Sequence, residues 1–342
     1  MDRRRAGGGQ PVSAPVFALR RMAAADKPAM LSISSRIWEG TDYLPAVFDE
    51  WVRDEVGEFT AVLVGKRVVG CAKLTFLTPT DAWLEGLRKD PGVSHRGLGR
   101  VVVEHLLDVL AARGNLTSVR FSTYVKNLAS RVTNERAGFR LRNALSIKAW
   151  EGSAAALRSL IQGRHPARPA GPVRPAPTVM RDEALALEFL ERHPYFEGTR
   201  GLVVEGWKAW PWSPGLFLER FVRKGACRGI PGPDGLEALG AWTILRRQGR
   251  VGVRLVCVES RTEEAAAALL EAAFDDLASA ASPAEAEPEA TLEVEWMVPP
   301  GDRYARWAAA AGLATIEQEN DFLVYELPLE MLARRSAAGE RP

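Results

Sequence analysis

The sequence predicts an α/β (α+β) fold, with a mixed, mostly antiparallel sheet flanked by helices and a second, degenerate copy of that arrangement after it. Residues 83–114 read as a strand, a glycine-rich loop and a helix. The order of two strands, helix, strand, helix and two strands then recurs in residues 239–326. Between the two copies, residues 163–177 hold five prolines and show no apolar periodicity, as expected of a linker.

The chain has 342 residues, which is enough for about two domains. A basic, Gly/Pro-rich leader precedes the first strand. We therefore expect five segments: a disordered leader (1–15), a first, catalytic domain (16–151), a proline-rich linker (152–177), a second domain (178–330) and a tail (331–342).

Composition excludes several classes of function. The net charge is only +2, from 45 basic and 43 acidic residues, which gives no support to nucleic acid or a membrane as the main partner. No apolar run reaches the length of a membrane span, and the leader lacks the apolar core of a signal peptide, so we expect a cytoplasmic protein. The three cysteines lack C-x-x-C spacing, and no His/Cys/Asp constellation has the spacing of metal ligands, so we expect no metal.

The pattern of the first copy can be followed in order. A strand at 16–20 precedes a helix at 24–37 and a short helix after Pro45, where proline suits a first helical turn. A hairpin turns around residues 65–67, and a third strand covers 83–88. The remaining elements are a helix at 100–113, a strand at 117–123, a helix at 128–137 and paired strands at 139–141 and 146–150.

The loop between residues 90 and 99 predicts an anion site. The first-turn N–H groups of a helix have no intrahelical partner and point toward such a loop. Glycines at 92, 97 and 99 allow the backbone to approach an anion closely, and Arg96 adds charge-assisted hydrogen bonds. The loop is not a Walker A motif, because no Lys-Ser/Thr pair follows its last glycine.

Two spaced motifs resemble those of the GCN5-related N-acetyltransferase (GNAT) superfamily. Arg96-Gly97-Leu98-Gly99-Arg100-Val101 resembles its R/Q-x-x-G-x-G/A pyrophosphate loop, although Val101 replaces a small residue. About 30 residues later, Asn127-x-x-Ser130 with the following E-x-x-G-F at 135–139 resembles its second acetyl-CoA motif. The resemblance implies an acyl-CoA N-acyltransferase fold with acetyl-CoA as cosubstrate. It implies these cofactor-binding residues: Leu87, Arg88, Lys89, Arg96, Gly97, Leu98, Gly99, Arg100, Val101, Asn127 and Ser130.

A closer resemblance concerns residues 38–51 and 84–88. The stretch from Trp38 through Asp42-Tyr43-Leu44-Pro45 to Trp51, and the strand Leu-Glu-Gly-Leu-Arg at 84–88, are similar to segments of the vertebrate histidine N-acetyltransferase family. The longer loop at 89–95 departs from that family's pattern. The resemblance implies a small-molecule amine as acceptor, with the α-amine of histidine or of another small amino acid as candidates.

Acetyl transfer to an amine defines the roles of the remaining candidates. The backbone N–H of Leu87 or Arg88 is the expected donor to the carbonyl oxygen as that oxygen gains negative charge. Glu85, between apolar neighbours on the central strand, is the expected base, and the alternative is a solvent-facing or salt-bridged glutamate. Asp42 and Tyr43 are expected to bind the acceptor, and the alternative for them is a helix-entry cap with a packed ring. The position seven residues after Asn127, often a tyrosine acid in GNAT enzymes, is Asn134.

The second copy lacks the features of a phosphate site. Its loop, Glu259-Ser260-Arg261-Thr262, has no glycine, and Glu259 with the glutamates of the following first turn would repel a pyrophosphate. We therefore expect this copy not to bind coenzyme A. A cluster of Trp207, Trp210 and Trp212 is expected either to line a substrate site or to lie in a core.

The sequence thus predicts an N-acetyltransferase for a primary amine. Within enzymes, the alternative acceptors are a polyamine, an antibiotic or a protein N-terminus. Outside enzymes, the alternative is a non-catalytic acyl-CoA sensor, which Asn134 and Val101 motivate.

Overall fold

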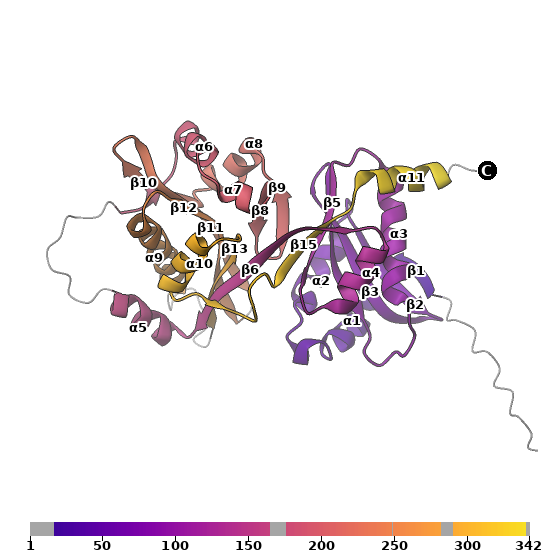
Figure 1. The fold of residues 1–342 in the computed structure, drawn as a ribbon. Coiled ribbons are helices and arrows are strands. Elements are labelled where there is room, and N and C mark those ends of the chain that lie inside the picture. The colour runs from indigo at the N-terminus through magenta and orange to yellow at the C-terminus, as the bar shows by residue number, and fades with distance from the viewer. Residues whose placement is uncertain (1–16, 165–175, 248, 282–289, 340–342) are drawn as a thin grey trace, which may run out of the picture. The chain divides into compact units, whose positions relative to one another are not determined.

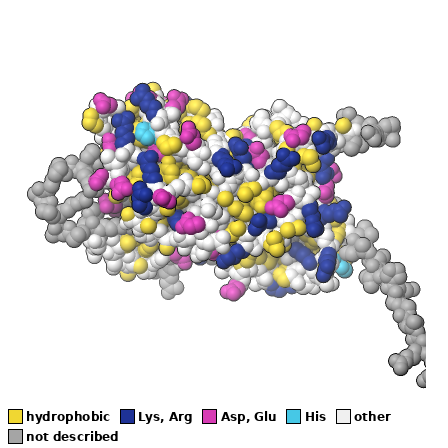
Figure 2. All heavy atoms as spheres, in the orientation of Figure 1, with side chains coloured by type: hydrophobic (Ala, Val, Ile, Leu, Met, Phe, Trp, Pro, Cys, Tyr) yellow, Lys and Arg dark blue, Asp and Glu magenta, His cyan; other side chains and the backbone are white. Residues whose placement is uncertain are grey.

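The computed structural model describes residues 17–164, 176–247, 249–281 and 290–339. The expected leader and most of the proline run of the linker lie outside these residues. The described residues form two compact units, one made of those up to 117 with those from 329 on, and the other of those from 118 to 328 (Figure 1). On the face drawn in Figure 2, basic and acidic side chains lie interspersed, as the near balance of charge in the sequence leads one to expect.

The first unit is an antiparallel sheet with helices. Its strands pair in the order β1-β2-β3-β4, and the β2–β3 hairpin turns at Gly65, whose φ is +60°. The elements are β1 (Phe17–Arg21), η1 (Ala24–Asp26), α1 (Lys27–Ser34), η2 (Trp38–Gly40), α2 (Leu44–Arg53), β2 (Glu58–Val64), β3 (Arg67–Thr78), β4 (Asp81–Lys89), α3 (Leu98–Arg113) and α11 (Leu329–Gly339). Residues 329–339, expected to be mostly tail, thus form a helix, which packs on α3 through Arg335 and its partner Asp108, 3.0 Å apart.

Aromatic rings join α2 to the sheet. Phe48 and Trp51 lie on the apolar side of α2, and their ring centroids are 5.6 and 5.3 Å from that of Phe59 on β2. All three side chains are buried, together with Met30 and Ile33 of α1. Burying these apolar surfaces is what holds both helices on the sheet.

The expected helix at 24–37 is shorter than predicted. Helix α1 ends at Ser34, and the next residues form a connector (residues 36–42) that leads to α2. Within it, Trp38, Glu39 and Gly40 have φ values of +46°, +56° and +86°. Left-handed backbone cannot continue an α-helix, and two of these residues are not glycine, so the connector stores backbone strain.

Strand β4 contains a bulge near its carboxyl end. Cys71 pairs with Arg88 and Lys73 with Glu85, so Ala72 faces both Gly86 and Leu87. Gly86 has a φ of +68°, and a Cβ atom at this position would lie 2.5 Å from the Trp51 ring. The bulge therefore depends on glycine for its backbone conformation and for the approach of α2.

The second unit contains a larger mixed sheet in the order β5-β15-β6-β13-β12-β11-β10-β7, with β14 against β6 and a separate β8–β9 hairpin. Its elements are β5 (Ser118–Tyr124), α4 (Leu128–Arg136), β6 (Arg140–Gly152), α5 (Ala154–Arg164), β7 (Thr178–Val179), α6 (Glu183–Glu191), α7 (Tyr195–Gly198), β8 (Leu202–Glu205), β9 (Lys208–Pro211), α8 (Pro214–Phe217), η3 (Leu218–Val222), β10 (Cys227–Gly232), β11 (Gly235–Arg247), β12 (Arg250–Ser260), α9 (Glu263–Ala280), β13 (Thr291–Val298), α10 (Asp302–Ala310), β14 (Ala314–Thr315) and β15 (Phe322–Glu326).

The prediction of two paired strands at 139–141 and 146–150 is wrong. Residues 140–152 form one continuous strand, β6, and its first half pairs with β15, from near the end of the chain. Strand β15 also pairs with β5, so it lies between β5 and β6. Asn143, which suggests a turn in the sequence, instead lies in the strand opposite Val324. Because β15 lies about 180 residues further along the chain, the sequence around β6 does not indicate that the two strands pair.

The order of elements repeats as expected. A hairpin, a helix, a strand and a second helix follow one another as β3-β4-α3-β5-α4 and again as β11-β12-α9-β13-α10. Each hairpin also has a register shift, between Cys71 and Lys73 on β3 and between Ala241 and Trp242 on β11. The boundary between the compact units, after residue 117, does not coincide with the boundary between the two copies of this order. The expected domain boundaries at 151 and 178 therefore remain a prediction. Among the described helices, none is long and apolar enough to cross a membrane.

Replacing Gly86 by alanine tests the bulge. We expect Gly86→Ala to lower the free energy of unfolding by about 2–4 kcal/mol, because it combines left-handed strain with a clash against Trp51. Gly65→Ala is the matched control, since its φ is also positive but no atom lies within 4 Å of the new Cβ. Urea denaturation of the full chain measures both, and an equal loss in the two variants would show that the Trp51 contact is unimportant.

Candidate active site

The end of β4 and the connector form a buried polar cluster. The Arg88 side chain is 7% exposed, and its Nη2 donates to Asp42 Oδ1 over 2.8 Å, while Nε donates to both carboxylate oxygens at 3.1 and 3.2 Å. Nη1 donates to the Leu87 carbonyl over 3.2 Å. The strand and the connector are thus joined by a bidentate ion pair that is shielded from water.

Asp42 has further partners within its own segment. It accepts hydrogen bonds from the Ser34 hydroxyl (2.8 Å) and the Leu44 N–H (3.2 Å), so it also acts as a cap at the start of α2. Burial on its own raises the pKa of Asp42, but the hydrogen bonds and charge of Arg88 outweigh burial and hold that pKa below its usual value. The cap, which the sequence offered as the alternative for Asp42, is present, and the charged partner of Asp42 is Arg88. Binding of the acceptor by Asp42 remains a prediction.

Two aromatic rings enclose the Arg88 guanidinium. Its Cζ lies 4.4 Å from the Trp38 ring centroid and 5.0 Å from that of Tyr43. Trp38 is 56% exposed, so its ring offers an accessible aromatic face beside a buried charge. Burial raises the pKa of Tyr43 to about 12, against the opposing charge of Arg88, and the nearby charge of Glu85 adds to the rise. Tyr43 therefore stays a neutral phenol in the physiological range.

Glu85 lies in the same part of the sheet. Its Oε1 accepts a hydrogen bond from the Thr75 hydroxyl over 2.6 Å, and its charge acts on both Tyr43 and Lys73. Lys73 is 1% exposed, pairs with Asp54 and donates to the Leu74 carbonyl over 2.8 Å. The structure thus brings Asp42 and Tyr43 into one cluster with Glu85 and Arg88, which lie more than 40 positions later in the sequence.

The expected anion loop follows directly from β4. Gly97 has a φ of +91° and immediately precedes α3, and its carbonyl accepts the first helical hydrogen bond, from Val101 N–H over 3.0 Å. No side chain caps this helix end, so the N–H groups of Leu98, Gly99 and Arg100 have no intrahelical partner. Among the described residues, neither Arg96 nor Arg100 forms an ion pair, and both are exposed. An anion such as a pyrophosphate fits these donors.

Asn127 and Ser130 lie in the second unit, at the start of α4. Asn127 Oδ1 accepts the Ser130 N–H over 3.2 Å and so caps the helix. Asn134, where GNAT enzymes often have a tyrosine, is buried and donates to the Ser130 carbonyl over 2.8 Å. The roles of Asn127 and Ser130 in binding coenzyme A remain predictions.

Sequence reasoning missed Asp90, Arg36 and Arg67. The carboxylate of Asp90 is 1% exposed and pairs with both arginines, at 3.0 and 2.6 Å. The only sequence signal is an aspartate followed by proline at the end of a strand, which also describes many ordinary turns.

Comparison with known proteins agrees with this arrangement. Residues 23–139 match the model of the acetyltransferase (GNAT) family. The structure is similar to that of a GCN5-related N-acetyltransferase from Sphaerobacter thermophilus, with a TM-score of 0.59 and 15% identity over 91% of this chain and 95% of that one. The fold is the GNAT fold. A presumed acetyltransferase from Pyrococcus horikoshii is also similar, with a TM-score of 0.50 and 13% identity over 95% of this chain and 93% of that one. No protein with a curated description matches the sequence.

The GNAT superfamily is thus supported by a sequence model and by structural neighbours, and it implies acyltransferase chemistry with acetyl-CoA. Because the structural similarity covers more than nine-tenths of the chain, the second region is consistent with a second GNAT-like domain. Nothing in the comparisons points to the histidine family in particular.

The second GNAT-like copy satisfies its helix end with its own side chains. Thr262 caps α9 by accepting the Ala265 N–H over 3.3 Å. The Glu259 carboxylate is fully buried, accepts the Ser260 N–H over 2.9 Å and pairs with Arg303 over 2.6 Å. A hydroxyl therefore caps this helix end, which has no side-chain cap in the first copy, and a buried carboxylate lies on the strand just before it.

A buried tyrosine joins two strands of the second copy. The Tyr195 hydroxyl donates to the Val256 carbonyl on β12 and accepts from Trp296 Nε1 on β13, both over 2.9 Å. Strands β12 and β13 pair only as far as Leu255 and Trp296, so Tyr195 bridges them where pairing stops. That this copy does not bind coenzyme A remains a prediction.

The three clustered tryptophans belong to separate contacts. Trp212 stacks on Phe196, with ring centroids 4.1 Å apart, and the Trp207 ring centroid lies 4.6 Å from that of Tyr124. The Trp210 ring centroid lies 4.0 Å from Cζ of Arg220. Trp210 is buried, and the other two are partly exposed. They do not form a common wall around one site.

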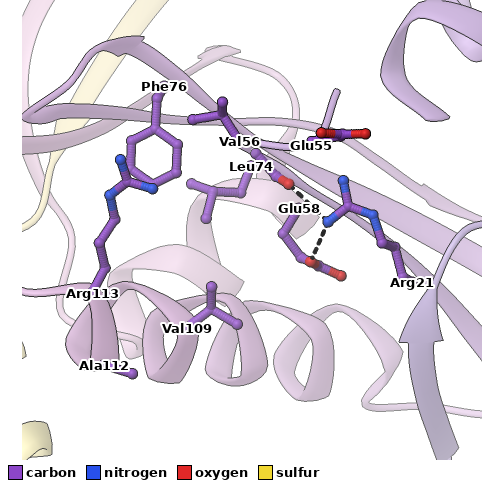
Figure 3. A pocket seen from close by; sticks show the side chains of 10 residues that line it. Arg21, Glu55, Val56, Glu58, Leu74, Phe76, Val109, Ala112 and Arg113 are labelled. Carbon is purple, nitrogen blue, oxygen red and sulfur yellow. Dashed lines mark hydrogen bonds and ion pairs between the residues drawn. The ribbon is translucent and has the colours of Figure 1, made fainter. Parts of the chain in front are cut away.

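A surface pocket of about 340 Å³ lies near the carboxyl end of α3 (Figure 3). Figure 3 shows Arg113 over the Phe76 ring and Arg21 bonded to Glu58 on opposite sides of an apolar floor. None of the expected site residues lines it. Among the described residues, no group of three His, Cys, Asp or Glu side chains has the arrangement of a metal site.

The Asp42–Arg88 pair makes a prediction about pH. A carboxylate whose folded pKa is depressed stabilises the fold above its unfolded pKa, near 3.8, and loses that contribution as pH falls through the folded value. Asp42→Asn should therefore cost about 3 kcal/mol of unfolding free energy at pH 7, and the difference from the unmodified chain should shrink below about pH 4.

Asp26→Asn is the control for this experiment. Asp26 pairs with Arg20, whose side chain is 43% exposed, so its loss should cost no more than about 1 kcal/mol. Denaturation at pH 7, 4 and 3 compares the two. A constant difference for Asp42→Asn across this range would contradict the assignment of a charged, stabilising Asp42.

Proposed function

We propose that the chain is an N-acetyltransferase that moves acetyl from acetyl-CoA to a primary amine on a small molecule. The observation that carries the proposal is the uncapped amino end of α3, with Gly97 in the left-handed conformation and the arginines at 96 and 100 unpaired among the described residues. The second copy supports it by contrast, because there the same helix end is capped by Thr262 and preceded by the buried carboxylate of Glu259.

Acetyl-CoA supplies the activated acetyl group, and the remaining roles belong to residues of this chain. The N–H groups of Leu98, Gly99 and Arg100, with the Arg96 side chain, hold the pyrophosphate. Of the two expected donors to the carbonyl oxygen, Leu87 N–H is favoured over Arg88 N–H. This is because the Arg88 N–H already contacts the Cys71 thiol. Burial raises the pKa of that thiol to about 12. Lys89 follows on the same strand as a further predicted contact to the cosubstrate.

Glu85 is the proposed base. It lies half-buried on β4, next to the bulge that carries the Leu87 N–H, and it accepts a hydrogen bond from Thr75. A carboxylate at this position can take the proton that the ammonium must lose before it attacks, directly or through water.

The connector supports a choice of acceptor. Trp38 offers an exposed aromatic face, and its backbone is strained, as is common where a side chain is held for recognition. Such a face stacks with flat or cationic groups. Histidine, whose imidazole is flat, therefore remains the first acceptor to test, with Asp42 and Tyr43 as the proposed acceptor residues. Polyamines, antibiotics and protein N-termini are the alternatives.

Gly97→Ala tests cosubstrate binding. We expect it to weaken coenzyme A binding by about tenfold, because alanine disfavours the left-handed conformation that opens the helix end. Gly114→Ala is the matched control at the other end of α3: its φ is +63° and, as at Gly97, no atom lies within 4 Å of the new Cβ. Calorimetric titration with coenzyme A measures both. Equal affinities for the two variants would place the pyrophosphate elsewhere.

Glu85→Gln tests the chemistry. Coenzyme A release is measured with acetyl-CoA against the twenty amino acids and a panel of polyamines, antibiotics and peptide N-termini. With the acceptor that responds, we expect the variant to lose about 10²–10³ in kcat with little change in the KM for acetyl-CoA.

The outcomes of this screen separate the alternatives. Unchanged turnover would assign Glu85 a structural role. Release with an acceptor other than histidine would discard the histidine hypothesis and keep the enzyme. No release with any amine, together with tight binding of acetyl-CoA, would favour an acyl-CoA sensor.

A further inference from the structure

Two ion pairs of opposite direction join the end of β4 to the connector. The Asp42–Arg88 pair is buried, whereas the Asp90 carboxylate is buried but the Arg36 side chain is 43% exposed. At one end of the connector, Asp42 binds Arg88 of the strand. At the other end, Arg36 binds Asp90, just after the strand, over 3.0 Å. The left-handed residues 38–40 lie between these two attachments. The strained segment is therefore fixed to β4 on both sides.

Asp90 also determines how the anion loop leaves the strand. Its Oδ2 accepts from Arg67 Nη2 over 2.6 Å, and its Oδ1 accepts from the Gly92 N–H over 2.8 Å as well as from Arg36. Its own N–H donates to the Val69 carbonyl over 2.8 Å, and its carbonyl accepts from Val93 N–H over 3.1 Å. Every polar group of this residue has a partner, and the side chain is buried, so the loop begins in one direction.

The other end of the loop is fixed by packing. Leu98, the first residue of α3, is 1% exposed and lies against Gly70 on β3, where a Cβ atom would be 3.0 Å from it. Seven residues separate the two anchors, Asp90 and Leu98. The N–H donors of so short a loop point at one anion only if Asp90 and Leu98 both keep their positions.

We propose that Asp90 is a positioning residue that couples the two substrate sites. It holds the anion loop in the binding conformation and, through Arg36, holds the connector that carries Trp38 and Asp42. Binding of coenzyme A at the loop therefore stabilises the connector. By thermodynamic linkage, a stabilised connector in turn strengthens the binding of coenzyme A. This inference rests on the proposed function.

The experiment compares Asp90→Asn with the unmodified full chain. Asparagine keeps the shape and the acceptor for Gly92 N–H but removes the charge that holds Arg36 and Arg67. Coenzyme A affinity is measured by calorimetry, and hydrogen exchange of residues 36–43 is followed with and without coenzyme A. We expect the variant to bind about tenfold more weakly and to lose the protection that coenzyme A gives to residues 36–43 in the unmodified chain.

Asp81→Asn is the matched control. Asp81 lies at the opposite end of β4, is 4% exposed and accepts from the Thr78 hydroxyl over 2.5 Å. Its substitution should affect stability without changing coenzyme A affinity or the protection of residues 36–43. An equal effect of both substitutions would overturn the proposal, as would unchanged binding and protection in Asp90→Asn.

A second variant covers the case in which Asp90→Asn does not fold. The Arg67 side chain is 64% exposed, so Arg67→Gln removes one partner of Asp90 without leaving a buried gap. It should weaken coenzyme A binding about threefold, and wild-type affinity would overturn the role of Asp90. If the unmodified chain itself does not bind coenzyme A, the proposed function fails and this inference with it, which is distinct from a failure of Asp90 alone.

Discussion

The N–H groups at the start of an α-helix have no partner within the helix, and the two halves of this chain meet that constraint in different ways. At α3, Gly97 adopts a left-handed conformation and no side chain closes the helix end. At α9, the Thr262 hydroxyl caps the helix end by accepting the Ala265 N–H. Water or an anion completes an open helix end, so this difference is what makes the start of α3 the proposed anion site. The rest of the candidate site is arranged around the open end.

Strand β4 connects that end to the chemistry. Its bulge displaces Gly86 and Leu87 from the regular ladder, and Trp51 packs where a side chain at 86 would be. The residues before and after the bulge, Glu85 and Arg88, then point to one polar cluster with Asp42 and Tyr43. A single strand thus positions the proposed base, the carbonyl donor and, through Asp90, the anion loop.

Much of the fold could be predicted from local patterns. The hairpin around Gly65, helix α3 and the long helix α9 each have a clear apolar period and a glycine or threonine at the correct end. The insertion of β15 between β5 and β6 could not be predicted, because its partners lie far away in the sequence. The left-handed turn at residues 38–40 was missed because Trp38 and Glu39 rarely adopt such a backbone.

The candidate site shows the same division. The anion loop was found because glycine spacing and a helix start are local features. The pairing of Asp42 with Arg88 was not, because the two residues are 46 positions apart and only the packing of the connector on β4 brings them together. Asp90 was missed for the same reason, since its partners Arg36 and Arg67 come from two other elements.

The stoichiometry of coenzyme A binding tests the central claim most directly. Calorimetric titration of the full chain should give one molecule of coenzyme A per chain, bound at the open helix end of the first copy. A stoichiometry of two would show that the closed helix end of the second copy also binds. The absence of any binding would show that an uncapped helix end and two exposed arginines are not sufficient to make this site.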